Sequence, residues 1–207
     1  MEQYKKELDR LYTGYIEPIL SGEQEVMPWW DIMDKEKPDF GDGTISRCSY
    51  EDYEFISTNF SVLDRALPED KIYFFPKMKD EVDINKFKDL TDGLFFNDIV
   101  DTMSEEVGTI VERSNVPLYY RSHEGHNGFL GWHTNCSNPE DRWYFVYNTD
   151  NNSSFLRYIE NGKMITKWEP KGWSLNHFTI TDCDNPFWHC IYTNSHRFSF
   201  GIRPKIK

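Results

Sequence analysis

The sequence lacks several patterns that mark well-defined classes of protein. It contains no run of roughly 18 apolar residues, the length that a membrane-spanning helix needs. Its first ten residues, MEQYKKELDR, lack the apolar region of a secretory signal. We find no internal repeat and no low-complexity segment. These absences predict a globular chain in the cytoplasm, without a membrane partner.

Cysteine is scarce and irregularly placed. The four cysteines are Cys48, Cys136, Cys183 and Cys190. They form no CxxC pair and no spacing typical of a zinc site. Because disulfides are rare in the cytosol, we expect four free thiols.

Basic residues are outnumbered by acidic ones. The chain has 23 Lys and Arg against 35 Asp and Glu, a net charge of −12. Such a surface repels nucleic-acid backbones, which disfavours a DNA- or RNA-binding role. The imbalance lies in residues 1–114, with 27 acids and 13 bases, whereas residues 115–207 have 8 acids and 10 bases. All six histidines lie after residue 114, so we expect the chemistry there.

The length of 207 residues suits a single domain, and an aromatic content of 16% supplies material for its core. Residues 1–114 are predicted to be mainly helical, because apolar residues recur at helical spacing in three segments. The predicted helical segments are 2–20, 49–67 and 95–113, with an irregular loop at 27–43 and one strand at 71–76. Ser49 is a candidate N-cap of the second segment, with Asp52 three residues on.

Residues 115–207 are predicted to form a β-domain. Short segments rich in aromatic and β-branched residues alternate with turn signals such as NTDNNS, ENG and EPKG. The eight predicted strands are 116–122, 129–135, 142–148, 154–159, 163–168, 173–180, 187–192 and 197–203. Several of them are apolar on both faces, so one face can fill a barrel while the other lies under the N-terminal helices. The fold class is therefore α+β, with a sandwich or barrel as its core.

Polar residues recur at strand spacing in three of these strands. His133 and Asn135 are two residues apart and share a face if the strand continues through both, and so do Arg197 and Ser199. If residues 193–195 form a three-residue hairpin loop, then His189 projects from the same side as Arg197 and Ser199.

The order of these residues resembles the 2-oxoglutarate/Fe(II)-dependent oxygenase superfamily. Its members carry His-x-carboxylate on the second strand of the core, His on the seventh and Arg-x-Ser on the eighth. The resemblance covers residues 115–207 and implies a double-stranded β-helix, a cupin-like jelly roll, wrapped by helices from 1–114. The segments GWHTN, SFLRY, WHC and RFSFGIR also resemble uncharacterised members of the superfamily that bacteriophages carry, which implies a location in the host cytoplasm.

The resemblance implies roles for individual residues. The catalytic, metal-binding set would be His133, Asn135 and His189, and the 2-oxoglutarate contacts would be Arg197, Ser199, Tyr120 and Tyr144. Two imidazoles and one further ligand on one face of Fe(II) leave positions open for a 2-oxo acid and O₂. A forked guanidinium suits the far carboxylate of 2-oxoglutarate. The implied activity is hydroxylation of a small-molecule, peptide or protein substrate.

Asn135 departs from the pattern, because the family has a carboxylate at this position. Three alternatives stay open: Asn135 ligates iron in a weakened site, another carboxylate completes the site, or the site is no longer an oxygenase. Candidate replacement carboxylates are Glu124, Asp141 and Asp184. The third alternative includes another metal, a halide-accepting variant and a non-catalytic binding or assembly module. Family halogenases have a very small residue here, which argues against the halide variant.

The other histidines and two arginines have ordinary explanations. His123, His126, His177 and His196 are expected in loops or at the surface, although His126 could lie on a strand beside His133. Arg142 and Arg157 are expected to form structural or surface pairs, with substrate contact as the alternative.

Overall fold

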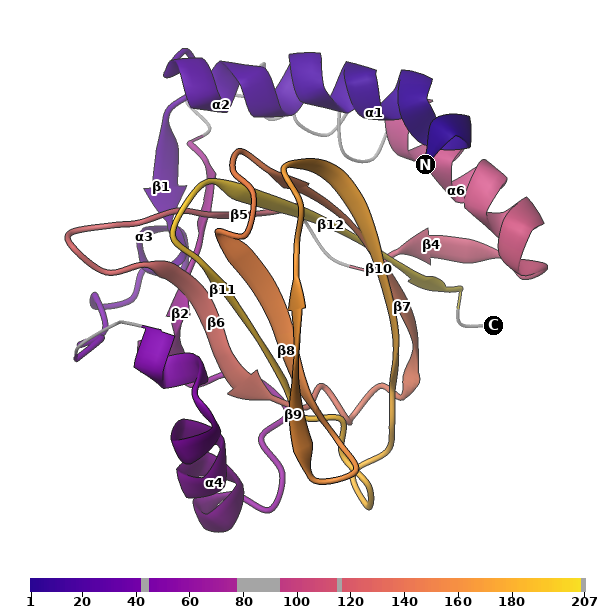
Figure 1. The fold of residues 1–207 in the computed structure, drawn as a ribbon. Coiled ribbons are helices and arrows are strands. Elements are labelled where there is room, and N and C mark those ends of the chain that lie inside the picture. The colour runs from indigo at the N-terminus through magenta and orange to yellow at the C-terminus, as the bar shows by residue number, and fades with distance from the viewer. Residues whose placement is uncertain (42–44, 78–93, 115–116, 206–207) are drawn as a thin grey trace.

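Two antiparallel β-sheets face each other in the computed structural model, which describes residues 1–41, 45–77, 94–114 and 117–205 (Figure 1). Within these residues the first sheet has the strand order β1-β3-β5-β12-β7-β10, with β4 also paired to β12. The second sheet has the order β2-β6-β11-β8-β9. The structure is thus a β-sandwich with several helices.

Each strand is short. The strands of the first sheet are β1 (Val26–Pro28), β3 (Phe74–Pro76), β4 (Val111–Arg113), β5 (Leu118–Tyr120), β7 (Glu140–Asn148), β10 (Gly172–Ile180) and β12 (Arg197–Pro204). Those of the second sheet are β2 (Lys71–Ile72), β6 (Gly128–His133), β8 (Ser154–Glu160), β9 (Lys163–Trp168) and β11 (His189–Thr193). The eight strands predicted within 116–203 are therefore confirmed, to within a few residues at their ends.

The N-terminal part is helical over most of the three predicted segments, but the second helix ends at Asn59 and residues 111–113 of the third segment form strand β4. The α-helices are α1 (Lys5–Leu11), α2 (Glu17–Ser21), α3 (Trp29–Ile32), α4 (Tyr50–Asn59) and α6 (Leu94–Val107). Shorter helical turns are η1 (Glu2–Tyr4), η2 (Tyr12–Ile16), η3 (Ile45–Cys48) and η4 (Pro68–Asp70). The N-cap prediction is confirmed, because the Ser49 hydroxyl accepts a hydrogen bond from the Asp52 N–H at 3.0 Å. The part of the predicted loop 27–43 that the structure describes also contains the end of β1 and all of α3.

Two details of the strand prediction are wrong. The segment 71–76 is not one strand, because β2 and β3 belong to different sheets. The predicted hairpin across residues 193–195 does not form either. β11 pairs with β6 and β8 in one sheet, whereas β12 pairs with β4, β5 and β7 in the other. The chain crosses between the sheets at this turn, so hairpin register cannot relate the two strands.

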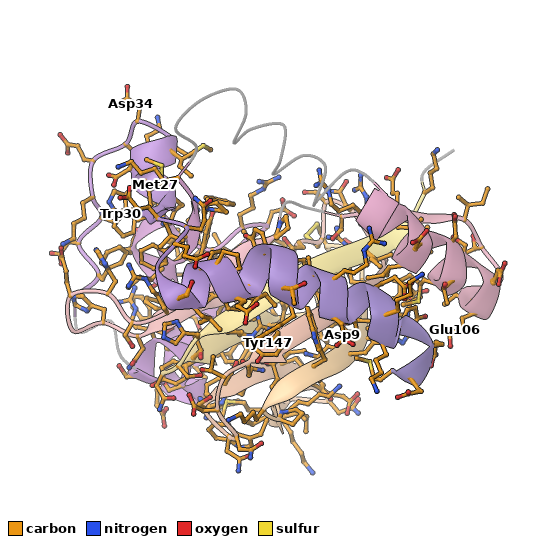
Figure 2. The ribbon with its side chains drawn as sticks, turned by 90° about the horizontal axis from the view of Figure 1, so that it is seen from above. Asp9, Met27, Trp30, Asp34, Glu106 and Tyr147 are labelled. Atoms are coloured by element: carbon orange, nitrogen blue, oxygen red, sulfur yellow. A yellow bond between two sulfur atoms is a disulfide. The ribbon has the colours of Figure 1, made fainter. Side chains whose placement is uncertain are left out.

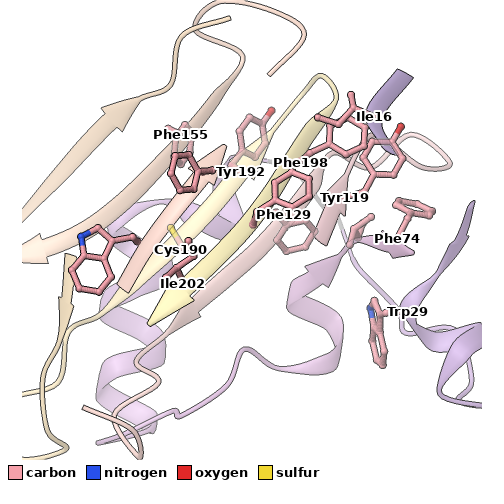
Figure 3. Packing of buried hydrophobic residues seen from close by; sticks show 14 of the residues in the cluster. Ile16, Trp29, Phe74, Tyr119, Phe129, Phe155, Cys190, Tyr192, Phe198 and Ile202 are labelled. Carbon is pink, nitrogen blue, oxygen red and sulfur yellow. The ribbon is translucent and has the colours of Figure 1, made fainter. Parts of the chain in front are cut away.

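Side chains alternate along β12 between a face that packs under the helices and a face that points between the two sheets. Phe198 and Phe200 pack edge-on against Tyr15 of η2, with ring centroids 6.2 and 5.7 Å apart. Figures 1 and 2 show the α1–α2 run lying across this side of the sheet, and Figure 3 shows Phe198 within the cluster of buried rings. Arg197 and Ser199 alternate with these residues and line a cavity between the sheets. One apolar face thus lies under the N-terminal helices, as the two-sided strands predicted.

The second sheet is covered in part by α4. Tyr53 of this helix contacts Trp132 and Trp188, with ring centroids 5.4 and 6.0 Å apart. The Trp132 indole N–H donates to the Ser49 carbonyl at 2.9 Å, which satisfies its only donor. No helix of the described residues is long and apolar enough to cross a membrane.

The expectation of four free thiols is wrong for two of them. Cys136 and Cys183 form a disulfide, because the segment after β6 and the loop before β11 bring their Cα atoms to 5.0 Å. This pairing spans 47 residues and has no local spacing signal. Cys48 and Cys190 are free and buried.

Candidate functional site

His133 and His189 form a cross-strand pair at the ends of β6 and β11. They are direct partners in the antiparallel register, and their ring centroids lie 4.1 Å apart. Their exposed fractions are 4% and 2%. The sequence placed them on separate strands, and the structure brings them together as predicted.

The two rings are held in the same way. The His133 Nδ1–H donates to the Gly131 carbonyl at 2.8 Å, and the His189 Nδ1–H donates to the Phe187 carbonyl at 2.9 Å. In the neutral tautomer that these bonds select, Nε2 carries the lone pair of each ring. A backbone carbonyl on the far nitrogen is also how proteins orient metal-binding histidines.

Burial keeps both imidazoles neutral. It lowers the pKa of His133 to about 4, with the Gly131 carbonyl partly opposing this shift. Burial and the neighbouring His133 ring lower the pKa of His189 well below its ordinary value. Near pH 7 both rings therefore offer a lone pair without first losing a proton.

The Asn135 side chain lies beside the two histidines, but strand alternation does not account for its position. β6 ends at His133, and Asn135 follows it in a left-handed conformation with φ of 53°. Its backbone N–H donates to the Asp64 carbonyl at 3.0 Å. Its side-chain Nδ2 lies 3.2 Å from the His189 Nε2, so the amide donates to the lone pair of that ring. Asn135 is thus beside the histidines, but the stated reason, a shared strand face, is wrong.

The candidate replacement carboxylates lie elsewhere. Glu124 pairs with Lys37, the Asp141 carboxylate accepts from the Thr179 hydroxyl at 2.7 Å, and Asp184 belongs to a turn after β10. None of them lines the cavity that contains the histidines. Among the described residues no group of three or more His, Cys, Asp or Glu side chains is placed to hold a metal ion.

The cavity between the sheets has a volume of about 290 Å³, at the lower end of the range for small-molecule sites. All seven residues of the predicted site line it: His133, Asn135, His189, Arg197, Ser199, Tyr120 and Tyr144. The structure therefore brings the whole predicted set to one cavity.

Arg197 is buried and already has a carboxylate partner. Its Nε and Nη2 donate to the two Glu169 oxygens at 2.8 and 2.9 Å, and both side chains are 1% exposed. Glu169 also accepts from Ser154 at 2.6 Å and from Asn176 at 2.7 Å. Burial alone would raise the pKa of Glu169, but the Arg197 charge and the hydrogen bonds from Arg197, Ser154 and Asn148 lower it. Glu169 was missed because its segment, EPKG, reads as a turn.

One edge of the Arg197 guanidinium is left for a ligand. Its Nη1 is buried without a hydrogen-bond partner among the described residues, and so is the Tyr120 hydroxyl. The guanidinium lies over the Tyr120 ring at 5.4 Å. Burial raises the pKa of Tyr120, which keeps this hydroxyl a donor. Tyr144 stacks on Phe178, with centroids 5.6 Å apart, and walls the cavity nearby.

The remaining histidines lie outside the cavity lining. His123 and His126 bridge each other across a turn, so His126 is not beside His133 on a strand. His177 stacks on Trp143 and is half exposed, and the Tyr119 hydroxyl lies 2.5 Å from the His196 Nδ1.

The two arginines differ in their surroundings. Arg157 has a structural role, since it donates to the Cys48 carbonyl at 2.7 Å. Arg142 lines the cavity and pairs with Glu140 at 2.5 Å.

Comparisons with known proteins give distant likenesses only. No family model and no curated protein matches the sequence. An oxidoreductase of the 2OG-Fe(II) oxygenase family from Burkholderia pseudomallei is similar in structure, with 10% identity and a TM-score of 0.39 over 68% of this chain. The chain covers 60% of that protein.

Carbohydrate-binding modules are also similar. A family 29 module variant has 10% identity and a TM-score of 0.29, over 45% of this chain and 75% of the module. The module CBM6cm-2 from Cellvibrio mixtus lichenase 5A has 14% identity and a TM-score of 0.22, over 47% of this chain and 88% of the module. At these values the likenesses carry no argument about function.

Proposed function

We propose that the chain is a non-haem Fe(II)- and 2-oxoglutarate-dependent oxygenase, most simply a hydroxylase, with a weakened metal site. One observation carries the proposal. The buried His133 and His189 rings are both tied by Nδ1 to backbone carbonyls, which leaves two neutral Nε2 lone pairs beside one cavity. Any buried neutral imidazole must satisfy its N–H, so the distinctive feature is that both rings line one cavity.

The strand order supports the jelly-roll reading behind this proposal. Counted from β5, the eight C-terminal strands are ordered 1-8-3-6 in one sheet and 2-7-4-5 in the other. This order results when a strand pair folds twice across a sandwich, as in a double-stranded β-helix. It also explains why the second and seventh strands, which carry the two histidines, are neighbours.

The side chains fit a metal ion in part. His133 and His189 would hold it through Nε2, and Asn135 would add an oxygen once its amide turned Oδ1 instead of Nδ2 towards the site. All three ligands are neutral, so the site suits Fe(II) less well than one with a carboxylate. When bound, Fe(II) would supply the activation of O₂ coupled to decarboxylation of 2-oxoglutarate.

The remaining roles belong to the chain itself. Arg197 Nη1 and the Tyr120 hydroxyl are buried donors without a partner among the described residues, and with Ser199 they would bind the far carboxylate of 2-oxoglutarate. Glu169 holds the guanidinium in place through two hydrogen bonds. The stacked Tyr144 and Phe178 rings line the cavity, and the Phe178 ring centroid lies 5.5 Å from that of His189.

A binding or assembly module without chemistry is the second candidate. Two observations favour it: Asn135 brings no charge to the histidine pair, and Glu169 occupies the fork of Arg197. In that case the amide hydrogen bond from Asn135 to His189 is the resting and only state of the site.

Asn135→Asp separates the two candidates. In a weakened oxygenase it should tighten Fe(II) binding by on the order of tenfold or more, because even unit charges ~4 Å apart interact by ~4 kcal/mol at an effective dielectric of ~20. Anaerobic titration with Fe(II) and 2-oxoglutarate should also strengthen a visible charge-transfer band. Asn138→Asp is the matched control, since Asn138 lines the same cavity three residues away.

The opposite outcome is equally measurable. A binding module would show no band in either form, and Asn135→Asp would lower its melting temperature by leaving a partly buried carboxylate beside unprotonated rings. Absence of the band in both forms, together with that loss of stability, overturns the oxygenase proposal.

A further inference from the structure

Positive charge is concentrated in the cavity of an otherwise acidic chain. The cavity lining includes Arg65, Lys71, Arg142, Arg197 and Arg203, and a single acid, Asp64. The whole chain has 35 acids and 23 bases. The lining therefore reverses the charge balance of the molecule, which is the arrangement expected around an anionic ligand.

Asp64 offsets one of these five cations and also holds the loop in place. Its carboxylate accepts from the Ser137 N–H at 2.8 Å, and its carbonyl accepts from the Asn135 N–H at 3.0 Å. These bonds fasten the loop before β2 to the segment that follows His133. As a result Arg65, the next residue, joins the lining of the cavity that contains the histidine pair.

Arg65 and Lys71 form one cationic wall. Neither has a carboxylate within ion-pair distance in the part of the chain that the structure describes. Burial and the charge of Arg65 lower the pKa of Lys71, so the two cations are near enough to repel each other. The Lys71 Nζ also lies 4.9 Å from the centre of the Trp29 ring. An anion between Arg65 and Lys71 would relieve this repulsion.

Arg142 supplies a donor from the facing sheet. It lies on β7, whereas Lys71 lies on β2 of the other sheet. Glu140 pairs with its Nη2, but its Nε is buried without a hydrogen-bond partner among the described residues. Its register partner on β10 is Phe178, whose ring centroid lies 5.5 Å from that of His189. The free donor is therefore close to the histidines.

Arg142 is far from Arg197 along the sheet. In the β7–β12 register Arg197 lies opposite Asn148, whereas Arg142 lies six residues away along β7. At ~3.3 Å per residue this places the two backbone positions about 20 Å apart. The cavity thus has two positive ends, and one small dianion bound at Arg197 does not neutralise the other.

We propose that the substrate is a small organic acid whose carboxylate or phosphate group is bound by Arg65, Lys71 and Arg142, beside the His133–His189 pair. The cavity volume of about 290 Å³ favours a small molecule over a folded or peptide substrate. That this ligand is a substrate rests on the proposed function, whereas binding of an anion at this site can be measured without metal.

Calorimetry in EDTA tests the site with three probes: succinate, inorganic phosphate and uncharged succinamide. The two anions should bind and succinamide should not. The double variant Arg65→Gln/Lys71→Gln should weaken phosphate binding at least tenfold. The matched control Arg10→Gln/Lys77→Gln removes two exposed cations outside the cavity and should leave phosphate binding within twofold. The charge-preserving pair Arg65→Lys/Lys71→Arg should retain most of the affinity.

Three results would overturn the anion site: succinamide binding as tightly as succinate, equal losses in the cavity and control variants, or competitive displacement of phosphate by saturating 2-oxoglutarate. The last result would place phosphate at Arg197. The two proposals can fail independently. Phosphate binding without a charge-transfer band would refute only the proposal that the chain is an oxygenase. A charge-transfer band without phosphate binding at Arg65 and Lys71 would refute only the proposal that the substrate is an organic acid.

Discussion

Replacement of Glu169 by glutamine removes the charge that balances Arg197 inside the sandwich. The carboxylate receives two hydrogen bonds from Arg197, at 2.8 and 2.9 Å, and one each from Ser154 and Asn176. Arg197 cannot neutralise itself by losing its proton. Removing one partner of a buried ion pair costs ~3–5 kcal/mol, because an unpaired buried charge is left behind. We expect Glu169→Gln near the low end of that range and Glu169→Ala near the high end.

Urea denaturation at pH 7 measures this loss directly. Glu160→Gln is the matched control, since Glu160 is exposed at the end of β8 and its substitution should change stability by less than ~0.5 kcal/mol. The double variant Glu169→Met/Arg197→Met should recover most of the loss, because well-packed apolar replacements of a buried pair are often neutral. A cost below ~1 kcal/mol for Glu169→Gln, with an unchanged denaturant slope, would refute the assignment of Glu169 as the charge partner of Arg197.

The same substitution has a pH signature. The pKa of Glu169 is lowered in the fold, because Arg197 and the hydrogen bonds outweigh burial. A lowered carboxyl pKa contributes stability that is present above the unfolded pKa of ~4.3 and is lost as pH falls through the folded value. Wild type should therefore lose more stability on acidification than Glu169→Gln does.

The Arg197–Glu169 ion pair also affects how variants of Arg197 should bind 2-oxoglutarate. Arg197→Ala should weaken 2-oxoglutarate binding more than removal of any other arginine, but it also leaves the Glu169 charge unpaired. Comparison with the doubly substituted Arg197→Ala/Glu169→Gln separates lost ligand contact from lost structure. Unchanged 2-oxoglutarate affinity in both variants would contradict the assignment of Arg197 as the anchor.

Three further outcomes follow from single residues. His133, whose pKa falls to about 4 on burial, should make the fold less stable as pH drops from ~6.5 to ~4, by up to about 3 kcal/mol, and His133→Gln should lose that dependence in acid titrations of stability. Ser49→Ala should cost ~1 kcal/mol by thermal unfolding, because the Asp52 N–H loses its cap, whereas Ser49→Asn should not. Gly131→Ala should destabilise the fold by ~1–3 kcal/mol in urea, because the added Cβ would lie 2.7 Å from the Asp70 Cβ; a neutral result would mean that Asp70 moves freely.

Strand positions were predictable from the sequence because their signals are local. Aromatic and β-branched residues between turns mark each strand, and alternation alone placed Arg197 and Ser199 on the face opposite Phe198. Strand pairing was not predictable in the same way. The turn at 193–195 has a length common in hairpins, yet it connects two sheets, and its local sequence does not distinguish the two kinds of connection.

The candidate site shows the same division. His133 and His189 were found through their order along predicted strands. Glu169, Asp64 and the Cys136–Cys183 disulfide were not, because each depends on a contact between distant segments that leaves no periodic trace. Asn135 was placed beside the histidines for the wrong reason: a left-handed residue after the strand end, fastened to Asp64, turns its side chain towards His189.

The neutrality of His133, His189 and Asn135 leads to a last prediction about the order of binding. A dication held by three uncharged ligands keeps its full charge, and the nearby Lys71 and Arg142 oppose it. The carboxylate of 2-oxoglutarate that faces the metal would reduce this unbalanced charge, so 2-oxoglutarate should raise the affinity for Mn(II), used as an oxygen-stable probe. By linkage Mn(II) must raise the affinity for 2-oxoglutarate by the same factor. We expect at least tenfold coupling by calorimetry, and a smaller factor in Asn135→Asp, where the protein supplies the charge. Equal Mn(II) affinity with and without 2-oxoglutarate would show that the two do not share the cavity.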